Sequence, residues 1–272
     1  MAAKKSGRKL TMLTAYDAPT AEILEKAGID MILVGDSLGM VVLGYPTTRP
    51  VTMDEMIHHA KAVRRGAKKS FIIGDLPLLG VEKGPKQALL SARRFIEEAG
   101  CDAVKVEWMP ARRPTVDLLI CKGIPVMGHV GLAPQTVKSK KGFGVRGGKA
   151  QEARDIFNAA LGLERAGIFS LLIECVPMSL ARAITESLKI PTIGIGAGPD
   201  CDGQVLVFHD IVGFFSRFTP RFVKRYADLG GAFEKAVLNF KKDVVEKRFP
   251  KGKHSFQMAP SEWRRFQEIK GR

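Results

Sequence analysis

Several features of secreted, membrane-spanning and zinc-binding proteins are scarce or missing in this sequence. Only four of its 272 residues are cysteines, and no two of them form a C-x-x-C pair. We therefore expect neither a disulfide framework nor a structural zinc site. No apolar stretch approaches the roughly 20 residues of a transmembrane helix, and residues 1–5 contain no apolar core of a secretory signal. A cytoplasmic protein with reduced thiols is the expectation.

The sequence also lacks an interdomain linker and a dinucleotide-binding glycine motif. No Pro- or Ser-rich stretch divides the chain, so we predict a single domain over residues 1–256 and a basic tail over residues 257–272. No G-x-G-x-x-G follows the first predicted strand, which weakens the case for an open dinucleotide-binding sheet.

The formal net charge of +15 is confined to three segments. Residues 1–9, 138–149 and 240–272 carry +4, +5 and +6, so the rest of the chain is neutral. Basic edges of this kind suit solubility, or attraction of polyanionic small molecules, as well as they suit nucleic acids. Because no recognised nucleic-acid-binding motif accompanies the charge, we expect no specific nucleic acid partner.

Short apolar runs alternate with helix-like segments along the chain. The runs are rich in Val, Ile and Leu and do not alternate with polar residues, which is typical of parallel strands covered on both faces. Most predicted helices end at a glycine, as a left-handed C-cap requires. We predict strands at 10–14, 31–35, 71–74, 103–107, 125–128, 169–174, 192–195 and either 205–209 or 212–215. We predict helices at about 18–27, from 53, 85–99, 114–122, 150–166, 178–188 and 222–247.

Eight strand–helix units in a chain of this length favour an α/β fold, the (β/α)₈ barrel, over an open doubly wound sheet. Thr52 is expected to cap the helix that starts at residue 53, with Glu55 three residues further on.

Ionisable residues stand at the ends of successive apolar runs. They are Asp36, Asp75, Lys105, Glu107, His129 and Glu174. Active sites of barrels lie at the C-terminal ends of the strands, so these side chains should meet at one mouth. Carboxylates there are costly unless they bind a metal or do chemistry, and the pattern therefore indicates an enzyme.

Two aspartates and a glutamate without histidine or thiolate partners make an oxygen-ligand set that suits Mg²⁺. We predict that Asp36 and Asp75 bind the metal directly, and that Glu107 binds it directly or through water. Each residue alone could instead cap a helix or form a salt bridge.

The other strand-end residues suggest proton abstraction next to a carbonyl, for which a divalent ion and a base are the usual equipment. Glu174 lies in the apolar sequence LLIECVP, which would raise its pKa and suit a general base; a buried ion pair is the alternative. Lys105 could neutralise a substrate carboxylate, form a Schiff base or pair with Glu107, with which it shares a strand face. His129 could hydrogen-bond a substrate or be a satisfied core histidine.

Beyond these residues, the chain closely resembles the 3-methyl-2-oxobutanoate (ketopantoate) hydroxymethyltransferase family from about residue 10 to residue 256. The matching blocks are TAYD at 14–17, VGDSLGM at 34–40, AVRRGA at 62–67, GDLP at 74–77, VKVE at 104–107, GHVGLAPQ at 128–135, ECVP at 174–177, IGIGAG at 193–198, DGQVLV at 202–207 and HSF at 254–256.

The resemblance implies a barrel of the phosphoenolpyruvate mutase type and the first committed step of pantothenate synthesis. It implies Mg²⁺ at Asp36, Asp75 and Glu107, the oxo acid at Asp36, Ser37, Asp75 and Lys105, and Glu174 as proton acceptor. It also implies 5,10-methylenetetrahydrofolate as one-carbon donor and a homo-oligomer, commonly a decamer.

The sequence departs from the family pattern in two places. Lys141 replaces the first glycine of a Gly-Gly-Phe/Tyr loop within residues 138–147. This loop would form a lid. The basic side chains of this segment would attract the glutamate tail of folate. The basic extension after Phe256 exceeds the usual end of the family. A related lyase resembling isocitrate lyase is the second enzyme candidate, but neither Cys121 nor Cys201 lies in its Lys-Cys-Gly type of sequence. A non-catalytic or nucleic-acid-binding barrel is the remaining alternative.

Overall fold

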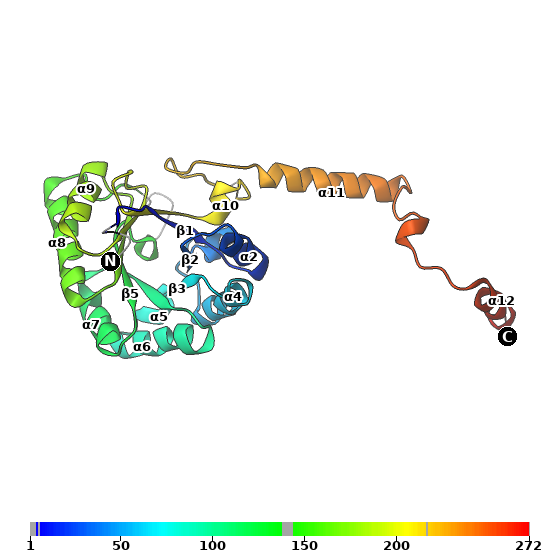
Figure 1. Ribbon diagram of the computed structural model, residues 1–272, viewed down its shortest axis with the longest axis horizontal. Coiled ribbons are helices and arrows are strands. Elements are labelled where there is room, and N and C mark those ends of the chain that lie inside the picture. The colour runs from blue at the N-terminus through cyan, green and yellow to red at the C-terminus, as the bar shows by residue number, and fades with distance from the viewer. Residues whose placement is uncertain (1–3, 5, 138–143, 216, 272) are drawn as a thin grey trace.

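The computed structural model describes residues 4, 6–137, 144–215 and 217–271, and its centre is a closed barrel of eight parallel strands (Figure 1). β1 pairs with both β2 and β8, which closes the sheet. The strands are β1 (Leu10–Thr14), β2 (Met31–Val34), β3 (Phe71–Asp75), β4 (Ala103–Glu107), β5 (Val126–Gly131), β6 (Ser170–Glu174), β7 (Thr192–Ile195) and β8 (Gly203–Leu206). The predicted (β/α)₈ fold is confirmed.

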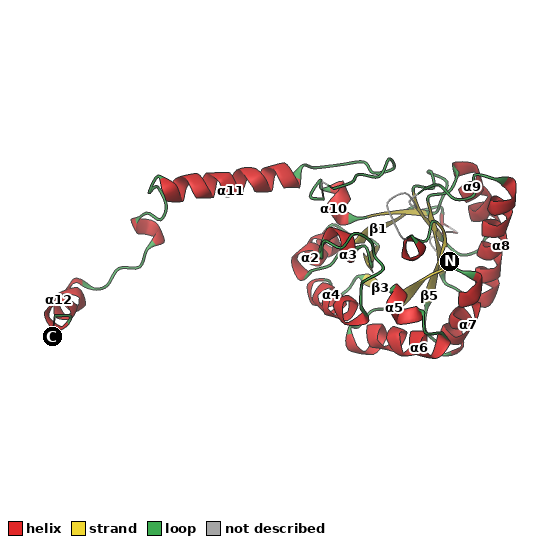
Figure 2. Ribbon diagram, turned by 180° about the vertical axis from the view of Figure 1, so that it is seen from behind, coloured by secondary structure: helices red, strands yellow, loops and turns green. Residues whose placement is uncertain are grey.

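Helices cover the outside of the barrel (Figure 2). The long ones are α2 (Ala18–Lys26), α4 (Met53–Gly66), α6 (Pro85–Arg93), α7 (Arg113–Cys121), α8 (Ala150–Ala166) and α9 (Met178–Ser187). A π-helical turn, Arg94–Glu98, extends α6. Three short helices stand at the C-terminal ends of strands: α3 (Leu38–Val41), α5 (Leu78–Val81) and α10 (Phe208–Ile211). Thr52 caps α4 in a reciprocal capping box with Glu55, as expected.

Both faces of the barrel strands are buried, which explains why their sequences are continuously apolar. One cluster, which includes Met12, Met127 and Leu172, fills the barrel interior. A larger cluster, which includes Ile72 and Phe95, packs between the strands and the helices. Successive side chains along a strand therefore alternate between two buried layers, one inside the barrel and one between the strands and the helices.

The end of the barrel differs most from the sequence prediction. The last strand is Gly203–Leu206, so the first predicted position overlaps it in part and the second, 212–215, is wrong. Glycine is needed at residue 203, the first of the strand, because a Cβ there would come within 2.6 Å of the carbonyl oxygen of Leu10 on β1. The apolar run continues past Leu206 into α10, whose side chains pack at the mouth of the barrel rather than within the sheet.

The chain then leaves the barrel as a long arm (Figure 1). The helix predicted at 222–247 begins only with α11 (Leu229–Val245), because Asp228 caps it by accepting a hydrogen bond from the backbone N–H of Gly231. A second helix, α12 (Pro260–Ile269), was not predicted. Neither helix has a buried residue. The domain boundary at residue 256 lies within this arm and stays a prediction.

None of the helices in the described part of the chain is long and apolar enough to cross a bilayer.

Candidate active site

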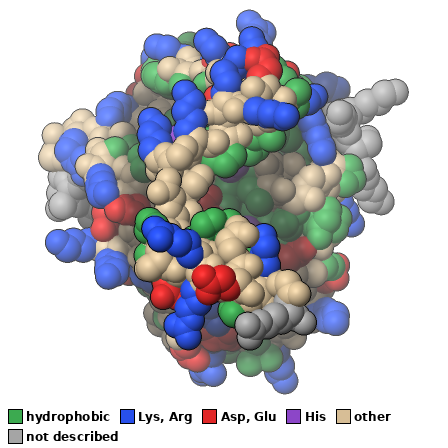
Figure 3. Space-filling model, turned by 90° about the vertical axis from the view of Figure 1, so that its right-hand side faces the viewer, with side chains coloured by type: hydrophobic (Ala, Val, Ile, Leu, Met, Phe, Trp, Pro, Cys, Tyr) green, Lys and Arg blue, Asp and Glu red, His purple; other side chains and the backbone are tan. Residues whose placement is uncertain are grey.

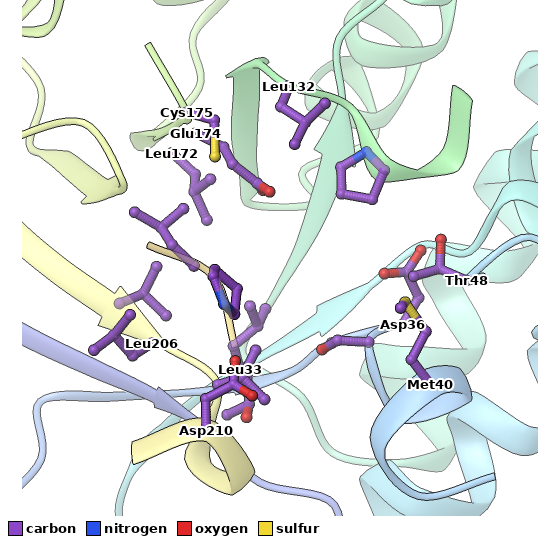
Figure 4. A pocket seen from close by; sticks show the side chains of 18 of the residues that line it. Leu33, Asp36, Met40, Thr48, Leu132, Leu172, Glu174, Cys175, Leu206 and Asp210 are labelled. Atoms are coloured by element: carbon purple, nitrogen blue, oxygen red, sulfur yellow. The ribbon is translucent and has the colours of Figure 1, made fainter. Parts of the chain in front are cut away.

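The strand-end residues of the sequence prediction meet in one cavity of about 380 Å³ at the C-terminal mouth of the barrel. Those that line it are Asp36, Ser37, Asp75, Lys105, Glu107, His129 and Glu174. They come from β3, β4, β5 and β6 and from the turn after β2, and Figure 4 shows Asp36 and Glu174 on different sides of the cavity. The predicted convergence is therefore confirmed, whereas the roles of the individual residues stay predictions.

Lys105 forms a buried ion pair, but with Asp75 and not with Glu107. The two residues are register neighbours on β4 and β3, and Nζ of Lys105 lies 2.6 Å from Oδ1 of Asp75. Burial alone would lower the pKa of Lys105, but the charges of Asp75, Glu107 and Asp36 together raise it above its ordinary value. The amine is therefore protonated and can hold a substrate carboxylate.

Gln135 is a site residue that the prediction missed. Its Nε2 donates to Oδ2 of Asp36 (3.0 Å) and to the carbonyl of Leu76 (2.9 Å), and its backbone N–H donates to Oε2 of Glu107 (3.2 Å). Arg112 donates to Oε1 of the same amide (3.0 Å), which fixes its orientation. Gln135 ends the GHVGLAPQ block, which was its only signal in the sequence.

Asp36 and Glu107 are both destabilised in their charged forms. Burial, followed by the charge of Asp75, raises the pKa of Asp36 to about 7. Burial also raises the pKa of Glu107 well above its ordinary value, although the charge of Lys105 opposes this. Among the described residues the cavity thus contains more carboxylates than Lys105 and Arg221 can balance, and a bound cation would offset the excess.

Glu174 and His129 face each other at the other side of the cavity. Burial raises the pKa of Glu174 to about 8. Nε2 of His129 lies 3.2 Å from Oε2 of Glu174, but without the alignment of a hydrogen bond, and both ring nitrogens lack a hydrogen-bond partner among the described residues. Burial lowers the pKa of His129 well below its ordinary value, so the ring is neutral. A substrate contact and a core role for His129 therefore both stay predictions.

The donor set is compatible with Mg²⁺ bound by two carboxylates. The described residues contain no group of three His, Cys, Asp or Glu side chains placed to hold a metal ion. Asp36 and Asp75 are adjacent, since the backbone N–H of Asp36 donates to Oδ2 of Asp75 (3.3 Å). Magnesium usually takes one or two carboxylates together with waters and substrate oxygens. This pair therefore fits the ion, and Glu107 lines the same cavity.

The outer part of the cavity was not predicted either. It is lined by apolar residues that follow α10, among them Phe215, Phe218 and Phe222, and by Asp210 of α10. Residues 138–143 of the predicted lid lie outside the described residues, but Val145 just beyond them lines the cavity. Basic side chains are scattered over the face shown in Figure 3 and mixed there with acidic and hydrophobic ones.

A family model described as ketopantoate hydroxymethyltransferase matches residues 1–252. The chain belongs to this family. A relative from Oleidesulfovibrio alaskensis, named 3-methyl-2-oxobutanoate hydroxymethyltransferase, is 53% identical over 266 residues, which cover 98% of this chain and 92% of the relative. A relative of the same name from Moorella thermoacetica is 52% identical and covers 94% of this chain and 95% of its own. Ketopantoate hydroxymethyltransferases thus match nearly the whole chain.

Solved structures agree on the fold. A phosphonopyruvate hydrolase crystallised with oxalate and Mg²⁺ superposes with a TM-score of 0.60 at 15% identity, covering 100% of this chain and 96% of that chain. A 2,3-dimethylmalate lyase, described as a member of the phosphoenolpyruvate mutase/isocitrate lyase superfamily, gives 0.56 at 15% identity and covers 99% and 94%. The barrel therefore shares its fold with these proteins, as the resemblance implied.

Proposed function

We propose that the protein transfers a hydroxymethyl group from 5,10-methylenetetrahydrofolate to 3-methyl-2-oxobutanoate, giving 2-dehydropantoate and tetrahydrofolate in pantothenate synthesis. The observation that carries this proposal is the convergence of Glu174, the Lys105–Asp75 pair and Asp36 in one cavity of a chain that belongs to this family. Such a cavity offers a base, a fixed positive charge and a cation site around one small substrate.

The metal would be held by Asp36 and Asp75, with Glu107 acting through water. When bound, Mg²⁺ supplies a Lewis acid that withdraws electrons from the keto group of the oxo acid. Gln135 keeps the carboxylate of Asp36 in place by donating to one of its oxygens. The ammonium of Lys105 and the hydroxyl of Ser37 would then bind the carboxylate of the oxo acid.

Glu174 is the proposed base. Its charged form accepts the proton from C3 of the oxo acid, so the C3–H bond breaks and its electron pair is left on the substrate as the enolate. The neutral ring of His129, which lies 3.2 Å from Glu174, would hydrogen-bond the reacting atoms. The nucleophilic C3 attacks the methylene carbon of the folate in its opened iminium form, and the electron pair of the C=N bond returns to N5. The oxygen of water then bonds to this carbon as the bond from the carbon to N5 breaks. A proton of that water goes to N5, so tetrahydrofolate leaves and the hydroxymethyl group is complete.

Exchange of the C3 proton tests this proposal without folate. We expect 3-methyl-2-oxobutanoate to exchange its C3 proton with deuterated water only when Mg²⁺ is present and residue 174 is glutamate. Proton NMR of the substrate follows the rate for the natural chain and for Glu174→Gln. An unchanged rate in the variant assigns the base to another residue.

The arm supports the proposal that the protein is a homo-oligomer, a decamer by resemblance to its family. α11 and α12 expose large apolar side chains, among them Phe233, Phe240, Trp263 and Phe266. Exposed apolar surface on this scale is typical of an interface, and a second copy of the chain is the occupant we propose. Light scattering after gel filtration measures the oligomer. We also propose that the enzyme acts in the cytoplasm.

A further inference from the structure

The cavity has a second polar position that the steps above do not use. Asp210, on α10, is 8% exposed and projects into the cavity (Figure 4). Within the described part of the chain its side chain makes no hydrogen bond and no ion pair, and the nearby Arg225 donates to Thr219 instead. Its carboxylate oxygens are not among the fully buried side-chain atoms that lack a partner, so they reach the open space of the cavity, where a ligand that donates hydrogen bonds can bind them.

The other carboxylates of the cavity already have partners or a role. Asp75 pairs with Lys105, while Asp36 and Glu107 accept hydrogen bonds from Gln135. Glu174 lies against His129 at the oxo-acid end. Asp210 is therefore the carboxylate left for the second substrate.

The surroundings of Asp210 suit a flat heterocycle. Phe215, Phe218 and Phe222 follow α10 and line the same cavity, and aromatic side chains stack on planar rings. The volume of about 380 Å³ lies within the range of small-molecule sites, about 300–1,000 Å³. The neighbourhood thus combines a hydrogen-bond acceptor with apolar walls, which is the chemistry of a heterocycle-binding site.

Tyr16 ties this end of the cavity to the oxo-acid end. Its hydroxyl lies 2.8 Å from Oγ of Ser37, and its ring lies 5.4 Å from the ring of His209, the residue before Asp210. Tyr16 is itself buried. The two ends are therefore held in a fixed relation by packed side chains, as a reaction between two bound molecules requires.

We propose that Asp210 binds the 2-amino-4-oxopyrimidine edge of the pterin ring of the folate. The inference rests on the proposed function, because it concerns the second substrate of that reaction. This edge presents two parallel donors, N3–H and the 2-amino group, which match the two oxygens of a carboxylate as a guanidinium does. With this edge at Asp210, the opposite edge of the pterin, which carries N5 and the methylene carbon, faces the oxo acid.

The test is a thermodynamic cycle in which the protein and the ligand are each changed in turn. Isothermal titration calorimetry at fixed pH and salt measures the dissociation constant of each pair. The ligands are tetrahydrofolate and its 2-desamino-2-methyl analogue, and the proteins are the natural chain and Asp210→Asn. Removal of either the carboxylate or the 2-amino group should weaken binding by roughly 10- to 100-fold, as expected for hydrogen bonds to a charged group. Removal of both should cost little more than removal of one.

The matched control is Asp117→Asn, the same substitution at an exposed ion pair with Arg113 on α7, which should leave tetrahydrofolate affinity unchanged. The inference is overturned if replacing tetrahydrofolate by the analogue weakens binding by the same factor in the natural chain and in Asp210→Asn. The carboxylate and the 2-amino group would then act independently. If the variant does not fold, the analogue still tests the natural chain, and undiminished affinity there overturns it. Failure of the proposed function is seen separately, as absence of Mg²⁺-dependent C3 exchange in the natural chain.

Discussion

Stability and activity should oppose each other at Glu174. Burial raises the pKa of this carboxyl from an ordinary value of 4.5 to about 8. The folded protein therefore binds the proton more tightly than the unfolded chain does. Its stabilising effect is fully present below about pH 4.5 and is lost as the pH rises through 8. Glu174→Gln keeps the shape of the protonated side chain and removes the charge, so its stability relative to the natural chain should grow as the pH rises from about 4.5 to 8 and stay level above that.

The size of the effect follows from the pKa difference. At about 1.4 kcal/mol for each pKa unit, the change from 4.5 to about 8 corresponds to at most about 5 kcal/mol. The free energies of unfolding of the two proteins should differ by about 1 kcal/mol or less at pH 5. At pH 9 the variant should be more stable by several kcal/mol, which is roughly 10 °C in Tm for a chain of this size. The same variant should have lost C3 proton exchange.

Urea denaturation with a chelator present, at pH 5, 7 and 9, measures this difference. Glu186→Gln on the exposed side of α9 is the control, since a solvated carboxylate gains nothing from losing its charge, and it should show no trend with pH. A difference between the natural chain and Glu174→Gln that stays the same from pH 5 to pH 9 would refute the reasoning, because the charged form would then carry no penalty from burial.

Three further predictions concern the neighbouring groups and the arm. Lys105→Met leaves Asp75 buried without its partner and should cost about 3–5 kcal/mol in urea denaturation; a smaller loss at neutral pH would mean that water reaches the pair. Gln135→Leu removes the donor that holds Asp36 and should weaken Mn²⁺ binding, measured by electron paramagnetic resonance, by about 10- to 100-fold. Deletion of residues 257–272 should leave the C3 exchange rate unchanged, because none of the described residues in that segment lines the cavity.

The barrel could be predicted because its signals are local. The apolar runs of β1, β4 and β7 end where the predicted strands end. Glu107 closes β4, and Gly196 follows β7. The eighth strand was misplaced because one apolar run covers both β8 and the start of α10. Only the long-range pairing of Leu10 with Gly203 fixes where this strand begins, and the sequence does not display that pairing.

The site was predictable as a group of residues but not as a set of contacts. Strand ends placed the ionisable side chains at one mouth, whereas the partner of Lys105 depends on the register between β3 and β4, which sets Asp75 beside it. Gln135 and Asp210 lie in short turns and helices after strands, where no periodic pattern marks a functional side chain. Their contacts with the cavity arise only from tertiary packing.

The state of Lys105 also decides between two ways of making a carbon nucleophile from an oxo acid, an enamine on a lysine or an enolate made by a base. Lys105 is the one lysine that lines the cavity among the described residues. Its amine is 2.6 Å from Asp75, and neighbouring carboxylates raise its pKa above the ordinary value. A protonated amine cannot attack a carbonyl, so a Schiff base is disfavoured. Borohydride added with 3-methyl-2-oxobutanoate should therefore leave the mass of the protein unchanged, and an adduct at Lys105 would replace the enolate route with the enamine route.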